Sequence, residues 1–230
     1  MKGMLKGLAR KLFAKYGPLD GLEAKSRFTR IYLGGRFRGG ESKSGAGSNL
    51  QETEVVRREL PALVQRLGVK TFLDAPCGDW YWMRTVRLSV DHYIGIDIVE
   101  ELIEQNTAAY SGQGIKFRCL DLATDPLPKA DLIFSRDCLV HLKYSDALSV
   151  LKNFRRSGAT YLLTTSFSDK KANLELAGTA SFWRPLNLEL PPFNFPPPLL
   201  YLNENCREEN GKYSDKCLGL WTLQDITHLA

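Results

Sequence analysis

The chain has 230 residues, of which 43% are hydrophobic and 25% charged, and its formal net charge is +5. This is the composition of a globular protein with enough apolar material for a sizeable core. No apolar run approaches the roughly 18–20 residues of a membrane-spanning helix, and the N-terminus lacks the apolar centre of a signal peptide, so we expect a cytoplasmic protein.

The positive charge is concentrated at the N-terminus. Residues 1–40 contain ten Lys or Arg against two acids, whereas residues 41–230 contain 21 basic and 24 acidic residues. Because nucleic-acid phosphates are bound by Lys and Arg, this balance leads us to expect no nucleic-acid partner. Apolar residues recur at helical spacing over residues 1–16, which predicts a basic amphipathic helix. The helix would pack on the domain or on a partner, or lie peripherally on an anionic membrane surface.

A glycine-rich segment at residues 34–48 follows this N-terminal part. It is either a linker or a loop that closes over an anionic group, using backbone N–H groups, serine hydroxyls and Arg36 or Arg38. We therefore divide the chain into an N-terminal region, residues 1–49, and a principal domain, residues 50–230.

Predicted helices and strands alternate from residue 50 onward. Apolar spacing predicts helices over residues 51–67, 80–88, 100–110 and 145–156, the first ended by Gly68 and the last capped by Ser145. Short apolar runs predict strands over residues 70–73, 92–96, 115–119, 130–134 and 161–167. This alternation predicts an α/β fold with a Rossmann-like, doubly wound, mostly parallel sheet.

The pattern changes after Phe167. Six prolines over residues 181–198 exclude a central strand and predict an irregular excursion. Residues 199–202 and 218–223 then predict a C-terminal antiparallel strand pair. The five cysteines form no CxxC motif, and we expect free thiols, with a disulfide between Cys206 and Cys217 as the alternative.

Acidic residues follow the first four predicted strands: Asp74, Asp97, Asp121 and Asp137. The carboxyl ends of parallel strands meet at one rim of the sheet, where open α/β folds bind ligands. An acid about 20 residues after the first turn suits hydrogen bonding to a ribose diol, and an acid beside that turn would repel a phosphate. The pattern therefore favours a cationic nucleoside over a pyrophosphate-containing ligand.

The ordered motifs LDAPCGDW, GIDI, LDL and SRDC resemble those of class I S-adenosylmethionine-dependent methyltransferases, over roughly residues 50–225. In the first motif, Pro76 and Trp80 replace two of the family's three glycines and Gly78 is kept. The resemblance implies S-adenosylmethionine as cofactor and S-adenosylhomocysteine as product, with the ribose on Asp97 and the adenine beside Asp121. The implied cofactor-binding residues are Asp74, Ala75, Pro76, Gly78, Trp80, Asp97, Ile98, Asp121, Leu122 and Arg136.

A narrower resemblance rests on the blocks GGESKSGAGS, LDAPCGDW, SRDCLVHL, WRPLNL, PPFNFPPP and DKCLGLW. Together they resemble methyltransferases of surface-glycan assembly, including chlorovirus sugar methyltransferase domains. This implies O-methylation of a sugar hydroxyl in a surface or capsid glycan, and it makes the glycine-rich segment a cover of the active site. Trp183 would stack on the sugar ring, or pack in the core, and the remaining acceptor-binding residues would be Arg184, Asn187, Arg38 and Ser44.

A sugar hydroxyl is a poor nucleophile until it loses its proton, and a general base helps by roughly 10²–10⁴-fold. Of the three histidines, only His141 follows a predicted strand end, four residues after Asp137. We predict His141 as the base and Asp137 as its orienting partner or an alternative base, the two sharing a helical face. Alternatively, Asp137 caps a helix and His141 packs on the cofactor, or both hold a divalent metal ion with a further acid. No third ligand lies nearby, so we do not favour the metal.

Other functions share parts of this pattern. A nicotinamide dehydrogenase would need a GxGxxG turn where this chain has PCGDWYW. A methyltransferase acting on another small molecule or on RNA, and a non-catalytic cofactor-binding module of a glycan-assembly complex, are the alternatives to sugar O-methylation.

Overall fold

The computed structural model describes residues 19, 21–37, 40–176 and 183–227. The predicted amphipathic helix over residues 1–16 lies outside this part of the chain, as does Arg38. Within the described part, no helix is both long and apolar enough to cross a membrane.

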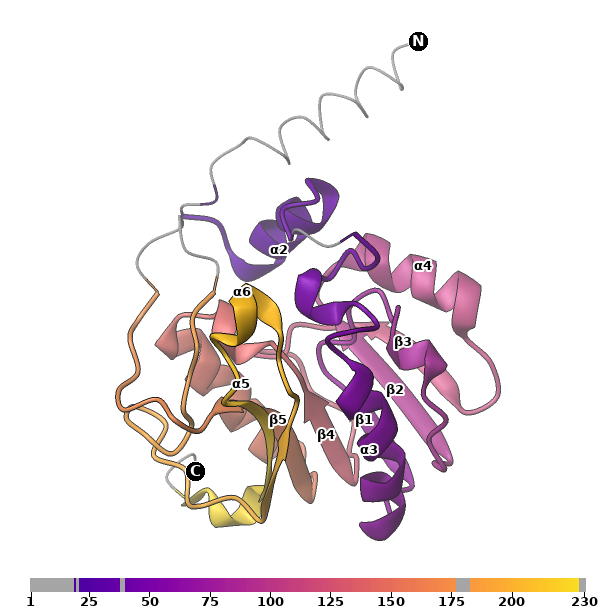
Figure 1. The fold of residues 1–230 in the computed structure, drawn as a ribbon. Coiled ribbons are helices and arrows are strands. Elements are labelled where there is room, and N and C mark those ends of the chain that lie inside the picture. Colours follow the sequence, from indigo (N-terminus) through magenta and orange to yellow (C-terminus); the bar gives the residue numbers. More distant parts are fainter. Residues whose placement is uncertain (1–18, 20, 38–39, 177–182, 228–230) are drawn as a thin grey trace.

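A seven-stranded sheet with the order β3-β2-β1-β4-β5-β7-β6 forms the centre of the molecule (Figure 1). Its strands are β1 (Thr71–Asp74), β2 (His92–Asp97), β3 (Ile115–Cys119), β4 (Leu132–Ser135), β5 (Tyr161–Phe167), β6 (Leu200–Asn203) and β7 (Lys216–Thr222). Strands β1 to β5 pair in parallel, whereas β7 is antiparallel to both β5 and β6. The predicted doubly wound, mostly parallel sheet with a C-terminal antiparallel pair is therefore confirmed.

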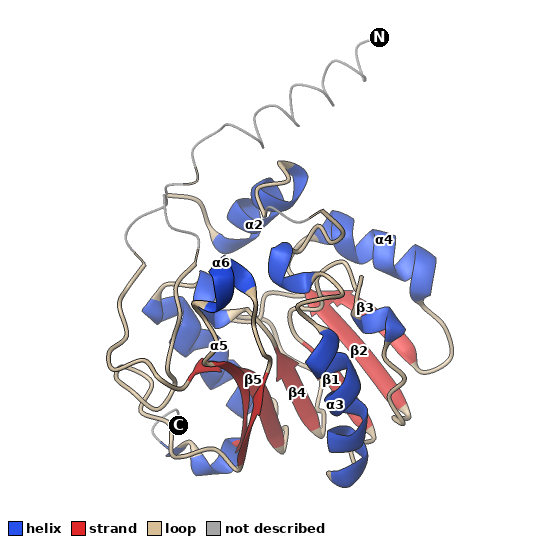
Figure 2. Ribbon diagram, in the orientation of Figure 1, coloured by secondary structure: helices blue, strands red, loops and turns tan. Residues whose placement is uncertain are grey.

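Helices pack on both faces of this sheet (Figure 2). Helices α3 (Glu54–Arg66) and α4 (Glu100–Tyr110) share one core cluster with Phe72, and α5 (Tyr144–Arg156) shares the other with Leu73. Consecutive side chains of a strand point to opposite faces, so β1 supplies both clusters. With both faces covered, the strand ends are the place where a ligand can reach the sheet.

Helix α2 (Ala24–Leu33) has no counterpart among the predicted helices, although Ala24, Phe28 and Ile31 have helical spacing. It lies beside α4 (Figure 1). The Lys25 Nζ of α2 is 3.4 Å from Glu100 Oε2 of α4. The one-turn helix α6 (Glu208–Gly211) precedes β7.

The prediction of a helix over residues 80–88 is wrong. Only a 3₁₀ turn forms there, at Met83–Thr85. The backbone is left-handed at Gly78 (φ 53°) and at Trp80 (φ 54°), which is incompatible with a helix starting at that point. The cap prediction is also wrong: Ser145 lies inside α5, which Lys143 precedes without a side-chain cap.

The proline-rich segment is irregular, as predicted, but it also completes the core. Leu186, Leu188, Phe193 and Phe195 are buried in the cluster that contains α5. All five cysteines are free thiols, so the disulfide alternative is wrong.

Candidate active site

A cavity of about 920 Å³ lies at the carboxyl ends of the parallel strands. Strands β3, β2, β1 and β4 are consecutive neighbours in the sheet, and the acids at or just after their carboxyl ends all line the cavity: Asp74, Asp97, Asp121 and Asp137. The topology thus brings together four residues that are spread over more than sixty positions of the chain. The cavity is large enough for a nucleoside and a small acceptor together.

The turn after β1 forms one wall of the cavity. Asp74 accepts a hydrogen bond from the hydroxyl group of Tyr93. Burial raises the pKa of Asp74 to about 8 despite that bond, so the carboxyl group is largely neutral at pH 7 until a cation lies beside it. Pro76, Gly78 and Trp80 also line the cavity, whereas Ala75 is buried in the core and only its backbone N–H is used, bonded to a carbonyl of β4.

Asp97 is fixed by the backbone at the end of β2. Its Oδ2 accepts from the N–H of Gly78 at 3.2 Å and its Oδ1 from that of Val99 at 3.0 Å. Burial raises the pKa of Asp97 to about 6, so it is mostly ionised at neutral pH. Each oxygen keeps a lone pair for a second donor. Asp97 can therefore accept from both hydroxyls of a diol.

Apolar side chains form a further part of the cavity wall, which we call the apolar slot. It is lined by Ile98, Val99, Leu102, Leu122, Leu142 and Val150. Asp121 stands at its edge, where Oδ1 accepts from the N–H of Ala123 at 2.8 Å. A flat, uncharged ring suits this slot, since apolar side chains line it and backbone and carboxylate groups meet its edge.

Residues 42–48 lie directly on the β1 turn. The carboxylate of Asp79 accepts from Ser42 Oγ at 2.9 Å, from the N–H of Lys43 at 2.7 Å and from Ser44 Oγ at 3.2 Å. A Cβ atom at Gly78 would stand only 2.3 Å from Ser44 Oγ, so this approach needs glycine. The segment is thus part of the cavity wall and not a linker, and Ser44 contacts the turn after β1.

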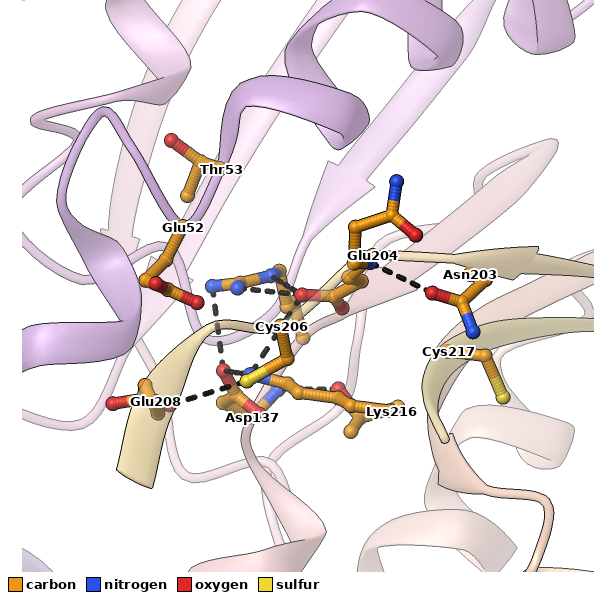
Figure 3. Close-up of polar contacts among 12 residues, drawn as sticks. Glu52, Thr53, Asp137, Asn203, Glu204, Cys206, Glu208, Lys216 and Cys217 are labelled. Atoms are coloured by element: carbon orange, nitrogen blue, oxygen red, sulfur yellow. Dashed lines mark hydrogen bonds and ion pairs between the residues drawn. The ribbon is translucent and has the colours of Figure 1, made fainter. Parts of the chain in front are cut away.

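A buried ion-pair network closes the other end of the cavity (Figure 3). Lys216 Nζ is 2.6 Å from Asp137 Oδ2, Arg136 Nη1 is 3.3 Å from the same oxygen, and Arg136 Nη2 is 2.7 Å from Glu204 Oε2. Burial raises the pKa of Asp137, but Lys216 and Arg136 outweigh it and bring the pKa to about 2. Asp137 is therefore ionised at any working pH and is a very weak base. Its Oδ1 is buried without a hydrogen-bond partner.

His141 lines the cavity from a 3₁₀ turn, Leu139–His141, and its ring centroid is 5.1 Å from that of Phe37. The predicted helical face shared with Asp137 is wrong, because Asp137 precedes the turn in a left-handed conformation (φ 53°). Asp137 makes no hydrogen bond to His141, since its Oδ2 is ion-paired and its Oδ1 has no partner.

Arg184 and Asn187 do not line the cavity. The buried guanidinium of Arg184 donates hydrogen bonds of 2.6–3.1 Å to three carbonyl groups within residues 139–142. The side chain of Asn187 is bonded to backbone groups of neighbouring loops. Both therefore bond the protein's own backbone instead of reaching an acceptor, and Arg184 holds the turn that carries His141. Trp183 does line the cavity, edge-on to Tyr213.

The described residues contain one group with metal-ligand spacing. The ligand atoms of Glu52, Cys206 and Glu208 lie within 4.8 Å of one another. His141 and Asp137 do not belong to this group. Glu52 Oε2 already accepts from the N–H of Arg207 at 3.0 Å.

Several residues of the site escaped the sequence-based prediction. Lys216 and Glu204 come from the C-terminal strand pair, Asp79 from the β1 turn and Arg27 from helix α2. The burial of Lys216 could have been predicted, because this lysine opens the apolar run KCLGLW and would be buried together with that strand. Nothing in the sequence pairs it with Asp137.

The comparisons with known proteins agree with this geometry. Residues 72–158 match the family described as a methyltransferase domain, and no curated protein sequence matches the chain. Human N-acetylserotonin methyltransferase, solved with SAM, has a TM-score of 0.58 at 16% identity over 95% of this chain and 66% of that one. The 1,6-didemethyltoxoflavin-N1-methyltransferase of Burkholderia thailandensis, solved with S-adenosylhomocysteine, has a TM-score of 0.56 at 16% identity over 85% of each chain.

A third structure, the N-methyltransferase NodS of Bradyrhizobium japonicum, matches at a TM-score of 0.40 and 18% identity over 48% of this chain. The chain spans 61% of NodS and 66% of the human enzyme, under two thirds of either length. The two longer matches cover 95% and 85% of this chain. The chain therefore has the fold of class I S-adenosylmethionine-dependent methyltransferases, with the methyltransferase domain match at residues 72–158.

Proposed function

We propose that the protein transfers the methyl group of S-adenosylmethionine to a hydroxyl group of a sugar in a surface or capsid glycan. The observation that carries the methyltransferase part is Asp97, held by two backbone N–H groups at a cavity whose next wall is an apolar slot. That arrangement suits a ribose diol and an adenine ring. The sugar acceptor is supported by the sequence blocks around Ser44 and Trp183.

Different cofactor-binding residues would contact the ribose, the adenine and the methionine part of S-adenosylmethionine. Asp97 would accept from the ribose hydroxyls, and Ile98, Asp121 and Leu122 would flank the adenine. The turn at Asp74 to Trp80 would meet the methionine part, where the carboxyl group of Asp74 becomes ionised beside a cationic ligand. Arg136, also expected to meet the cofactor, lines the cavity within the ion-pair network.

When bound, S-adenosylmethionine supplies a methyl group already activated on a sulfonium. The chain then has to align the acceptor oxygen, exclude water and accept a proton. His141 would take the proton of the acceptor hydroxyl as the oxygen–methyl bond forms and the sulfur–methyl bond breaks. With a pKa of about 2, Asp137 is too weak a base for this step. Its unpartnered Oδ1 would instead accept a hydrogen bond from the acceptor or from the His141 ring. Residues 42–48 would exclude water.

The second candidate is methylation of another small molecule. It is favoured by the size of the cavity and by the printed names of the two longer structural matches, which are methyltransferases of N-acetylserotonin and of 1,6-didemethyltoxoflavin. A cytoplasmic location, with residues 1–16 touching a membrane surface or a partner, stays a prediction.

The test is a methyl-transfer assay with isotopically labelled S-adenosylmethionine and a panel of methyl glycosides, beside calorimetry with S-adenosylhomocysteine and NAD. We expect binding of S-adenosylhomocysteine alone and labelling of at least one glycoside. Binding without labelling of any glycoside would contradict the sugar acceptor and favour the second candidate. Binding of NAD alone would contradict the methyltransferase assignment.

A further inference from the structure

Lysine and arginine side chains meet the cavity from three parts of the fold. Those that line it among the described residues are Arg27, Arg36, Lys43, Arg136 and Lys216. Arg136 and Lys216 belong to the buried ion-pair network, and Lys43 Nζ lies 3.5 Å from both Tyr32 Oη and Gln105 Oε1. Arg36 has contacts of its own.

Arg27 differs from the other four. Its Nη2 is buried and has no hydrogen-bond partner. The guanidinium carbon is 5.0 Å from the centroid of the Phe28 ring, a contact that orients the group but satisfies no N–H donor. An unmade hydrogen bond to a buried charged donor is costly, so a ligand oxygen that reaches this nitrogen gains binding free energy.

Helix α2 aims this donor at the cavity. Ala24, Arg27 and Phe28 all line it, and their spacing puts them on one helix face. The helix is held in place near its C-terminal end, where Tyr32 Oη lies 3.0 Å from Gln105 Oε1 of α4. The donor is therefore presented by an anchored element.

The negatively charged residues of the cavity limit which ligand group Arg27 can bind. The strand-end rim carries the acids Asp74, Asp97, Asp121 and Asp137, with Asp79 at the β1 turn. A ligand carboxylate is disfavoured near this rim unless a cation compensates it. A neutral sugar brings no anion, whereas S-adenosylmethionine brings one carboxylate on its methionine part.

We propose that Arg27 binds the carboxylate of the methionine part of the cofactor. The inference rests on the proposed function, because it needs S-adenosylmethionine as the ligand. It assigns to helix α2, outside the predicted principal domain, a direct part in cofactor binding. A charge-assisted Arg–carboxylate pair would satisfy the buried guanidinium nitrogen that has no partner within the protein.

The test compares two ligands that differ only in the carboxylate. Calorimetry on the full chain uses S-adenosylhomocysteine and its decarboxylated analogue, 5′-(3-aminopropylthio)adenosine, which keeps the amino group. In Arg27→Met, we expect affinity for S-adenosylhomocysteine to fall by about 10- to 100-fold, the range of a charge-assisted hydrogen bond. Affinity for the analogue should change by less than about two-fold. Arg27→Lys should keep an intermediate affinity, because it restores the charge but not the fork.

Lys25→Met is the matched control. The substitution removes one positive charge from the same helix. Because Lys25 is not among the residues that line the cavity, both affinities should stay near wild type. Thermal melting without ligand verifies that each variant is folded. Equal losses of affinity for both ligands in Arg27→Met, or no loss of affinity for S-adenosylhomocysteine, would overturn the inference. A loss of methyl transfer with cofactor affinity intact would overturn it too, because Arg27 would then bind a group of the acceptor. A wild-type protein that binds neither ligand would overturn the proposed function as well.

Discussion

The two ends of the cavity are built in different ways. At the proposed cofactor end, Asp74, Asp97 and Asp121 each lie at or just after the end of their own strand, and their partners are backbone N–H groups or one neighbouring tyrosine. At the proposed acceptor end, Asp137 depends on Lys216, which is 79 positions away. The cofactor end is therefore fixed by local sequence on adjacent strands, while the acceptor end exists only once β7 has docked. Substitutions should separate the two ends by affecting ligand binding at one and folding at the other.

The largest expected effect is the loss of the ion-pair network. Lys216→Met removes one of the two cations that Asp137 and Glu204 share, and Arg136 stays paired with both carboxylates. Breaking a buried ion pair costs about 3–5 kcal/mol of the free energy of unfolding, and we expect a loss of up to that size. The Asp137 side chain is 20% exposed and that of Glu204 only 1%. Urea denaturation measures the change. The matched control is Lys212→Met, which removes an exposed lysine before the same strand and should leave the unfolding midpoint nearly unchanged. Equal midpoints for the two variants would mean that the network does not hold the acceptor end together.

The next effect concerns turnover. If His141 is the base, His141→Ala should lower kcat by about 10²-fold, within the usual contribution of a general base. Affinity for S-adenosylhomocysteine should stay within a few-fold, because His141 contacts Phe37 and the acceptor end. Steady-state kinetics with an active glycoside and calorimetry give the two numbers. His92→Ala, at the exposed amino end of β2, is the control and should be silent. Unchanged kcat in His141→Ala would remove it from the mechanism.

At the cofactor end, the matching substitution is Asp97→Ala. It removes the acceptor for both ribose hydroxyls, a loss of about 1–3 kcal/mol, or roughly 5- to 150-fold in affinity for S-adenosylhomocysteine. Unlike Lys216→Met, it should leave a folded protein, as checked by thermal melting. Asp91→Ala, exposed at the opposite end of β2, is the control. Unaltered affinity in a folded Asp97→Ala protein would contradict the ribose assignment.

The two ends should also differ in the pH dependence of stability. The folded pKa of Asp137 is about 2, below its ordinary 3.8, so its carboxylate stabilises the fold above pH 3.8 and loses this as pH falls toward 2. The difference corresponds to about 2 kcal/mol, which Asp137→Asn should abolish. Burial raises the pKa of Asp74 to about 8, so the ligand-free fold loses stability as pH rises from about 4 to 8. Asp74→Asn should remove that decline. Denaturation curves across pH whose slopes do not change in these two directions would contradict the assigned protonation states.

The contrast explains what could be predicted from the sequence. Strand periodicity locates the end of each strand, and the topology brings those ends together, so the position of Asp97 and Asp121 at one cavity follows from the sequence. The pairing of Lys216 with Asp137 does not follow from it, since pairing between distant segments depends on register and side-chain direction. The inward direction of Arg184 cannot be predicted either, because a polar residue in an irregular excursion gives no sign of where its side chain points. The prediction of a helix after β1 is wrong because apolar spacing carries no information about a left-handed residue such as Trp80.

The smallest expected effect concerns the boundary of the cofactor end. Among the described residues, those that line the cavity begin at Leu22 and include α2. If residues 1–18 make no contact with the cofactor, removing them should leave the affinity for S-adenosylhomocysteine within about two-fold of that of the full chain. Removing residues 1–36 also takes away α2 and Arg27, and should weaken that affinity. In that case the principal domain would begin before α2 and not at residue 50. Calorimetry on both truncated chains, each checked by melting, measures this. Equal affinities would restore the boundary at residue 49, and a loss already in the shorter truncation would move the cofactor end into the first 18 residues.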